Sequence, residues 1–78
     1  MDNNVAQIKN RAMEFLAQSE IDLPHAESCV RFYHIRAAVV RACIEVGPPN
    51  ASRRAALRKP EFSRVERELR QSILGQRK

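Results

Sequence analysis

The chain has 78 residues, of which 44% are hydrophobic, 29% are charged and only two are glycine. This length excludes a multidomain enzyme, and the composition is too apolar for a disordered chain and too poor in glycine for a turn-rich β protein. Lysine and arginine outnumber aspartate and glutamate by 14 to 9, which gives a net charge of +5 and favours an acidic partner. We therefore expect residues 1–78 to form a single all-α domain, a small bundle of three main helices and one short helix.

The first predicted helix covers residues 5–19. Helical spacing relates Val5, Ile8, Ala12, Phe15 and Leu16, which indicates a stripe that packs against a core. Asn4 precedes this stripe and is predicted to cap the helix.

The second predicted helix covers residues 24–46 and is the longest. Pro24 is tolerated only in a first helical turn, and Gly47 stands where a left-handed residue commonly ends a helix. At 1.5 Å per residue this helix spans roughly 34 Å, about the width of such a domain. We therefore expect it to be the central helix of the bundle.

A helical projection of residues 24–46 predicts a wide apolar face and a polar face opposite. Arg36 falls in the middle of the apolar face, so we expect it either to pair with an acid such as Glu14 or to face a partner. The apolar face comprises Cys29, Val30, Phe32, Tyr33, Ala37, Val39, Val40, Cys43 and Ile44, and the polar face comprises Glu27, Arg31, His34, Arg41 and Glu45.

Two further helices are predicted after the Pro48-Pro49 break. Asn50 is a good cap for a short helix over residues 51–58. The last helix covers about residues 61–74, with its start at either Pro60 or Ser63. The spacing of Phe62, Val65, Leu69 and Ile73 predicts a narrow stripe for a helix–helix contact.

Residues that carry catalysis or bind metals are nearly absent. Cys29 and Cys43 fall on the predicted apolar face, where burial keeps a thiol inert, and we expect both to be reduced core residues. His25 and Cys29 have the spacing of two zinc ligands, but two more ligands are missing. With only two glycines there is no phosphate-binding loop. We predict no enzyme activity, no catalytic residue, no metal and no cofactor.

Charge divides the chain into two halves. Residues 1–30 hold two basic and five acidic residues, whereas residues 31–78 hold twelve basic and four acidic residues. Part of this positive charge is expected to be offset by pairing within the chain, for example between Glu66 and Arg70. The residues predicted to bind nucleic acid or another anionic partner are Arg53, Arg54, Arg58, Lys59, Arg64 and Arg67.

Two functions remain open at this point. One is a small regulatory protein that contacts DNA phosphates through the Arg-rich region of residues 53–70. The other is a modulator of another protein, an inhibitor or adaptor of the kind that mobile elements encode, which docks its basic and apolar surface on an acidic partner. In the second case the centre of the interface is expected around Arg36, Phe62 and Leu69.

The cellular setting is also predicted from the sequence. The polar start of the chain, Met1 to Asn4, does not resemble a signal peptide, and Arg41 and Glu45 interrupt the most apolar segment. We therefore expect a cytoplasmic protein without a membrane partner. A core this small rarely stabilises a monomer by more than about 3 to 5 kcal/mol, so a homodimer is expected.

Overall fold

The computed structural model describes residues 3–47 and 52–75, without the side chains of Asn3, Asn4 and Arg53. All regular structure in this part of the chain is helical, which confirms the predicted all-α bundle. The elements are α1 (Asn3–Ala17), the short 3₁₀ helix η1 (Leu23–His25), α2 (Ser28–Val46), α3 (Arg53–Leu57) and α4 (Pro60–Gly75).

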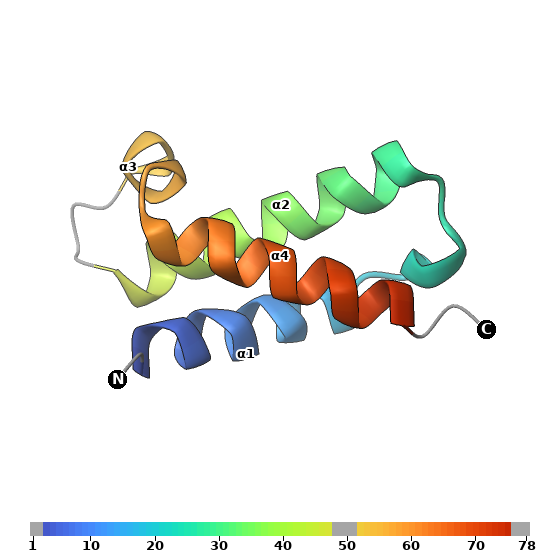
Figure 1. Ribbon diagram of the computed structural model, residues 1–78, viewed down its shortest axis with the longest axis horizontal. Coiled ribbons are helices and arrows are strands. Elements are labelled where there is room, and N and C mark those ends of the chain that lie inside the picture. Colours follow the sequence, from blue (N-terminus) through green and yellow to red (C-terminus); the bar gives the residue numbers. More distant parts are fainter. Residues whose placement is uncertain (1–2, 48–51, 76–78) are drawn as a thin grey trace.

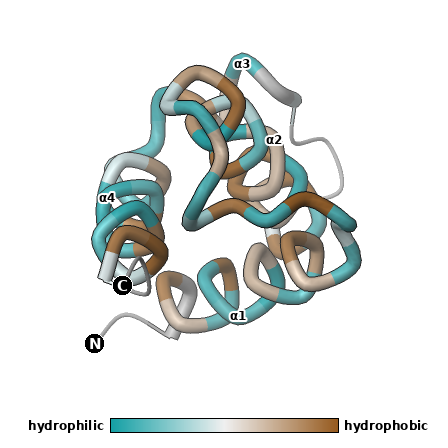
Figure 2. The backbone as a smooth tube through the Cα atoms, turned by 90° about the vertical axis from the view of Figure 1, so that its right-hand side faces the viewer, coloured by the Kyte–Doolittle hydropathy of each residue, from teal (hydrophilic) through white to brown (hydrophobic). Residues whose placement is uncertain are grey.

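The three long helices lie side by side along the long axis of the molecule (Figure 1). α1 and α4 run in the same direction and α2 runs opposite to both, so that each long helix contacts the other two. α3 packs at the end of the bundle where α2 ends and α4 begins. Figure 2 shows the bundle along this axis, with the hydrophobic stretches of the helices turned toward one another. α3 and the first turns of α4 therefore form one end of the bundle.

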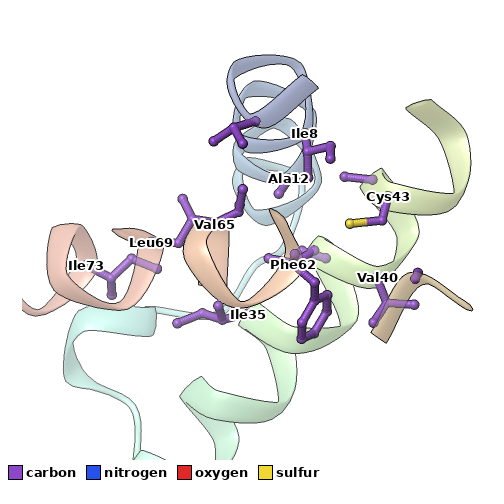
Figure 3. Close-up of a cluster of buried hydrophobic side chains, with 14 of the residues drawn as sticks. Ile8, Ala12, Ile35, Val40, Cys43, Phe62, Val65, Leu69 and Ile73 are labelled. Atoms are coloured by element: carbon purple, nitrogen blue, oxygen red, sulfur yellow. The ribbon is translucent and has the colours of Figure 1, made fainter. Parts of the chain in front are cut away.

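The core lies between the three long helices (Figure 3). The stripe predicted on the last helix is confirmed, because all four of its residues are buried. α1 contributes part of its predicted stripe, with Phe15 and Leu16 packed at the edge. The buried apolar residues of α1 and α4 are Val5, Ile8, Ala12, Phe62, Val65, Leu69 and Ile73.

The predicted apolar face of the second helix is partly wrong. Val39, Val40 and Cys43 are buried as expected, but Val30, Phe32, Tyr33 and Ile44 are exposed. The buried side of α2 is shifted around the helix toward residues outside the predicted face, which are Arg31, Ile35, Ala38 and Ala42. Arg31, expected on the polar face, is tolerated there because its guanidinium donates to the Ala26 carbonyl at 3.1 Å and to the Ser28 hydroxyl at 3.3 Å.

The second helix is also shorter than predicted. Residues 23–25 form η1, and Ala26 and Glu27 are extended, with ψ angles of 159° and 151°, before α2 begins at Ser28. Leu23 is buried and η1 contacts α4 as well as α2. Burial of Leu23 against the bundle therefore accounts for a first turn that does not continue into α2.

The helix ends differ in detail from the predictions. α1 extends from Asn3 to Ala17, so Asn4 lies inside the helix and does not cap it. Gly47 has a φ of −77° and is extended, so the predicted left-handed end is wrong. Asn50 lies outside the described residues, and the observed cap of α3 is Ser52. α4 begins at Pro60, the earlier of its two predicted starts.

Candidate functional site

The candidate site lies where α3 meets the start of α4 (Figure 1). The Ser52 hydroxyl accepts a hydrogen bond from the Ala55 backbone N–H at 3.1 Å, which fixes the start of α3. Ala56 is buried and anchors this short helix against the bundle. Arg58 ends α3, Lys59 follows it, and Pro60 begins α4 with the fixed φ that suits a first turn.

Three of the eight cations on the three long helices, Lys9, Arg11 and Arg36, are held by acids of a neighbouring helix. Lys9 donates to Glu68 at 3.1 Å, which links α1 to α4. The Arg11 guanidinium donates to both carboxylate oxygens of Glu45 at 3.0 and 2.9 Å, which links α1 to α2, and it also pairs with Glu14. These ion pairs neutralise much of the charge along the bundle.

A second network joins α2 to α4. Arg36 donates two hydrogen bonds to Glu66, at 2.9 and 3.3 Å, and the hydrogen-bonded carboxylate raises the pKa of the Arg36 guanidinium. Arg70 lies 3.8 Å from the same carboxylate and stacks over the Phe32 ring at 4.2 Å. The expected pairing of Arg36 with Glu14 is therefore wrong, because Glu14 is bound by Arg11 and the acid beside Arg36 is Glu66.

The predicted basic residues fall into three groups. Arg64 donates to Glu68 at 3.2 Å, so part of its charge is offset within α4. Arg53 begins α3, but its side chain is outside the described part. The remaining residues form no ion pair with any residue of the described segments, and we call them the basic patch: Arg54, Arg58, Lys59 and Arg67.

The basic patch faces solvent. Arg54 and Arg58 are four residues apart and both exposed at α3, while Arg67 is exposed in the second turn of α4. Lys59, between the two helices, is half-buried. Leu57 is the single large exposed apolar residue within this stretch of the described chain. The patch therefore consists of cations with little apolar surface and no exposed aromatic ring.

The predicted interface centre is not supported as a surface. Phe62 and Leu69 are only 4% and 2% exposed, because both are part of the core between the helices (Figure 3). Arg36 keeps about half of its side chain exposed beside Glu66. The expected exposure of the stripe around Phe62 and Leu69 is thus wrong, and exposed apolar residues lie instead on α2.

This apolar surface on α2 was not predicted from the sequence. Val30, Tyr33, Ala37 and Ile44 are all exposed and lie along one side of the helix, and we call them the α2 stripe. Their spacing was visible in the sequence, but the projection assigned them to the core. Tyr33 is 68% exposed, and its ring meets the His34 ring edge to face at 5.4 Å.

The candidate zinc ligands are occupied by other contacts. His25 Nδ1 lies 3.0 Å from an Asp22 carboxylate oxygen, and the exposed Cys29 thiol lies 3.8 Å from Glu27. Cys29 is thus not the core residue expected, whereas Cys43 is buried. Across residues 3–47 and 52–75 no three histidine, cysteine, aspartate or glutamate side chains gather as metal ligands.

A hollow lies at the opposite end of the bundle from α3. It measures about 430 Å³ and is bordered by the end of α1, by η1 and by the last turns of α4. Its walls are largely apolar, with Met13, Leu16, Ile21 and Ile73 among them. The single charged residue among those that line it, Asp22, already binds His25, so the hollow offers no unpaired charged group to orient a ligand.

Comparisons with known proteins add no assignment to this geometry. None of the helices described here is long and apolar enough to cross a bilayer. No protein-family model, curated protein or solved structure matches the chain.

Proposed function

We propose that the protein is a small regulatory protein that binds the phosphate backbone of duplex DNA through the basic patch. One observation carries the proposal: Arg54, Arg58, Lys59 and Arg67 form no ion pair within the described residues, whereas Lys9, Arg11 and Arg36 are bound by acids of neighbouring helices. Unpaired arginine and lysine side chains on a solvated surface are the groups that contact phosphate oxygens.

The composition of the patch favours DNA over an acidic protein. The centres of protein interfaces are enriched in aromatic residues, and the basic patch contains none. The exposed aromatic residues Phe32 and Tyr33 lie near the start of α2, while α3 packs beside its end (Figure 1). Phosphate binding requires only cations with free donors, which is what the patch provides.

The salt dependence of DNA binding tests the proposal. Each phosphate contact contributes about −0.9 to the slope of log affinity against log salt, so four contacts predict a slope of about −3.6. Fluorescence anisotropy with a labelled random-sequence duplex, between about 50 and 200 mM salt, measures this slope. Replacing Arg54, Arg58 and Lys59 by alanine is expected to reduce the slope to about −0.9.

Two controls separate DNA binding from general attraction of anions. Arg67→Ala is expected to reduce the slope by about 0.9, whereas Arg41→Ala, which removes an exposed arginine of α2 outside the patch, leaves it unchanged. Polyglutamate serves as the acidic protein mimic. If the chain binds polyglutamate as tightly as DNA, or if the triple alanine variant keeps the full slope, the proposal is wrong.

The alternative function, a modulator of an acidic partner protein, is favoured by a different observation. The α2 stripe exposes apolar and aromatic side chains that the basic patch does not have. The stripe lies on α2, whereas the basic patch lies on α3 and α4, so the two surfaces share no residue (Figure 1). This observation favours α2, and not the basic patch, as the protein-binding surface.

A further inference from the structure

The α2 stripe has the geometry of a helix–helix contact. Val30, Tyr33, Ala37 and Ile44 are separated by three, four and seven residues, which places them on one face of α2. The line from Val30 to Ile44 is about 21 Å long. Val30 and Ile44 are each 37% exposed, and Tyr33 is 68% exposed. An exposed apolar line of this kind is typical of a surface that another protein covers.

A shallow hollow borders the stripe on the side of α1. It measures about 180 Å³ and is lined by residues of both helices, among them Phe15, Leu16, His34 and Ala37. Ala37 belongs to both the hollow and the stripe, so the two surfaces are continuous. An apolar helix face beside a groove is the arrangement that accepts the side chains of a second amphipathic helix.

The charge around the stripe selects the partner. Residues 28–44 contain no aspartate or glutamate. Arg41 is exposed between Ala37 and Ile44 and stacks on the Phe15 ring at 4.2 Å, and Arg36 lies on the other side of the stripe, where Glu66 offsets part of its charge. The acids near the end of the stripe, Glu14 and Glu45, are bound by Arg11.

A second copy of the chain does not complement this surface. In two stripes placed face to face, neither chain supplies an aspartate or glutamate between residues 28 and 44 that could pair with Arg41 of the other chain. Acidic residues beside an apolar helix face would pair with Arg41 and with the exposed part of Arg36. The predicted homodimer is therefore not expected to use this face.

We propose that the α2 stripe docks an amphipathic helix of a different protein, with acidic residues flanking the apolar face of that helix. Tyr33 is the anchor, because it is the most exposed of the large apolar side chains described and because tyrosine is enriched among energetically dominant interface residues. Arg41 supplies the preference for acidic residues on the partner helix. The stripe and the basic patch share no residue, so binding at α2 does not use the cations proposed to contact DNA.

Binding of two synthetic helical peptides tests the proposal. Both peptides carry leucine on one heptad face; one has glutamate at the flanking positions and the other has lysine. In fluorescence anisotropy we expect the glutamate peptide to bind at least about tenfold more tightly than the lysine peptide. Tyr33→Ala is expected to weaken binding of the glutamate peptide about tenfold. Because Tyr33 is exposed, its replacement leaves the urea unfolding curve unchanged.

A pair of charge reversals provides the matched control. Arg41→Glu is expected to remove the preference for the glutamate peptide, whereas Lys59→Glu, the same charge change on the basic patch, keeps it. Equal binding of both peptides, or unchanged binding after Tyr33→Ala, overturns the proposal. Two other results also overturn the proposal. One is a dimer, seen in sedimentation, that Tyr33→Glu dissociates, because the occupant of the stripe is then a second copy of the chain. The other is binding to phosphatidylserine vesicles that depends on Tyr33.

Discussion

Arg36 of α2 and Glu66 of α4 form an ion pair across the bundle, with the Arg36 Nε 2.9 Å from a Glu66 carboxylate oxygen. The two partners differ in environment, because the Glu66 side chain is 6% exposed and the Arg36 side chain is 51% exposed. A half-exposed arginine thus pairs with a buried carboxylate. The second arginine near Glu66, Arg70, is more distant at 3.8 Å.

This relationship predicts unequal effects of single and double substitutions. Arg36→Ala leaves the buried carboxylate with a weak partner and is expected to lower the free energy of unfolding by about 1 to 3 kcal/mol. Replacing the pair together, Arg36→Met with Glu66→Leu, is expected to recover most of this loss, because no charge is then buried. Urea unfolding measures both values. Equal losses in the single and double variants would show that the ion pair is not the cause.

The core assignment predicts that Val40→Asp unfolds the protein. Val40 is 5% exposed, and an unpaired carboxylate buried at this position costs more than a domain of this size can lose. Tyr33→Asp is the matched control on the same helix, and it is expected to keep the helical circular dichroism spectrum because Tyr33 is exposed. A folded Val40→Asp protein would contradict the assignment of this side of α2 to the core.

Two interhelical ion pairs predict how stability depends on pH. The Arg11 guanidinium lowers the pKa of Glu45, and the Lys9 ammonium lowers the pKa of Glu68, each mainly through a hydrogen bond. Folded pKa values below the unfolded value of about 4.3 give stabilisation that is complete above that pH and is lost as the pH falls through the folded pKa. The urea concentration at the midpoint of unfolding should therefore decrease as the pH is lowered from about 5 to about 3.

A double variant isolates this contribution. Glu45→Gln combined with Glu68→Gln removes both titrating groups, and its urea midpoint is expected to change less over the same pH interval. Glu20→Gln is a suitable control, since this exposed acid appears in no ion pair among the described residues. An unchanged pH dependence in the double variant would contradict the assignment.

The two cysteines are predicted to differ in reactivity. Cys29 is exposed at the start of α2, whereas Cys43 is 2% exposed and burial raises the pKa of its thiol. We expect Ellman's reagent to titrate one thiol rapidly in the native protein and the second only after unfolding. In the Cys29→Ser variant the rapid reaction should disappear. Two rapidly reacting thiols in the native wild-type protein would show that Cys43 is not protected by the core.

Local sequence patterns predicted much of the fold. The stripe from Phe62 to Ile73 is buried as its spacing indicates, because α4 has one apolar side and a strongly polar remainder. The order of the four helices also follows from local signals, which left the start of α4 open between Pro60 and Ser63. These features depend on residues close together in the chain, where spacing alone determines which side chains share a face.

The buried side of α2 could not be predicted in the same way. Apolar residues occur around most of this helix, so its neighbours decide which of them are covered. α1 and α2 share the most extensive contact in the bundle, and Ala12 on α1 and Ala42 on α2 are both fully buried. Small residues such as these alanines allow the two helices to pack closely. In a helical projection, however, the larger apolar residues Phe32 and Tyr33 indicate the buried side more strongly, and both are exposed.

The sequence predicted which cations lie in the candidate site, but not which of them form ion pairs. The cations of residues 53–70 were visible from the sequence, whereas their pairing depends on tertiary contacts such as Lys9 with Glu68, which are 59 residues apart. Arg64 pairs with Glu68 one turn further along α4, whereas Arg67 forms no ion pair in the described segments. The basic patch is thus a smaller set than the one predicted.

The central claim is that the basic patch contacts DNA phosphates, and NMR of the arginine side chains tests it most directly. In a protein labelled with ¹⁵N, titration with a random-sequence duplex is expected to shift the Nε–H resonances of Arg54, Arg58 and Arg67 and to leave those of Arg11 and Arg36, which are bound by Glu45 and Glu66, in place. Shifts confined to Arg11, Arg36 or Arg41, or no shifts at DNA concentrations that saturate binding, would contradict the account.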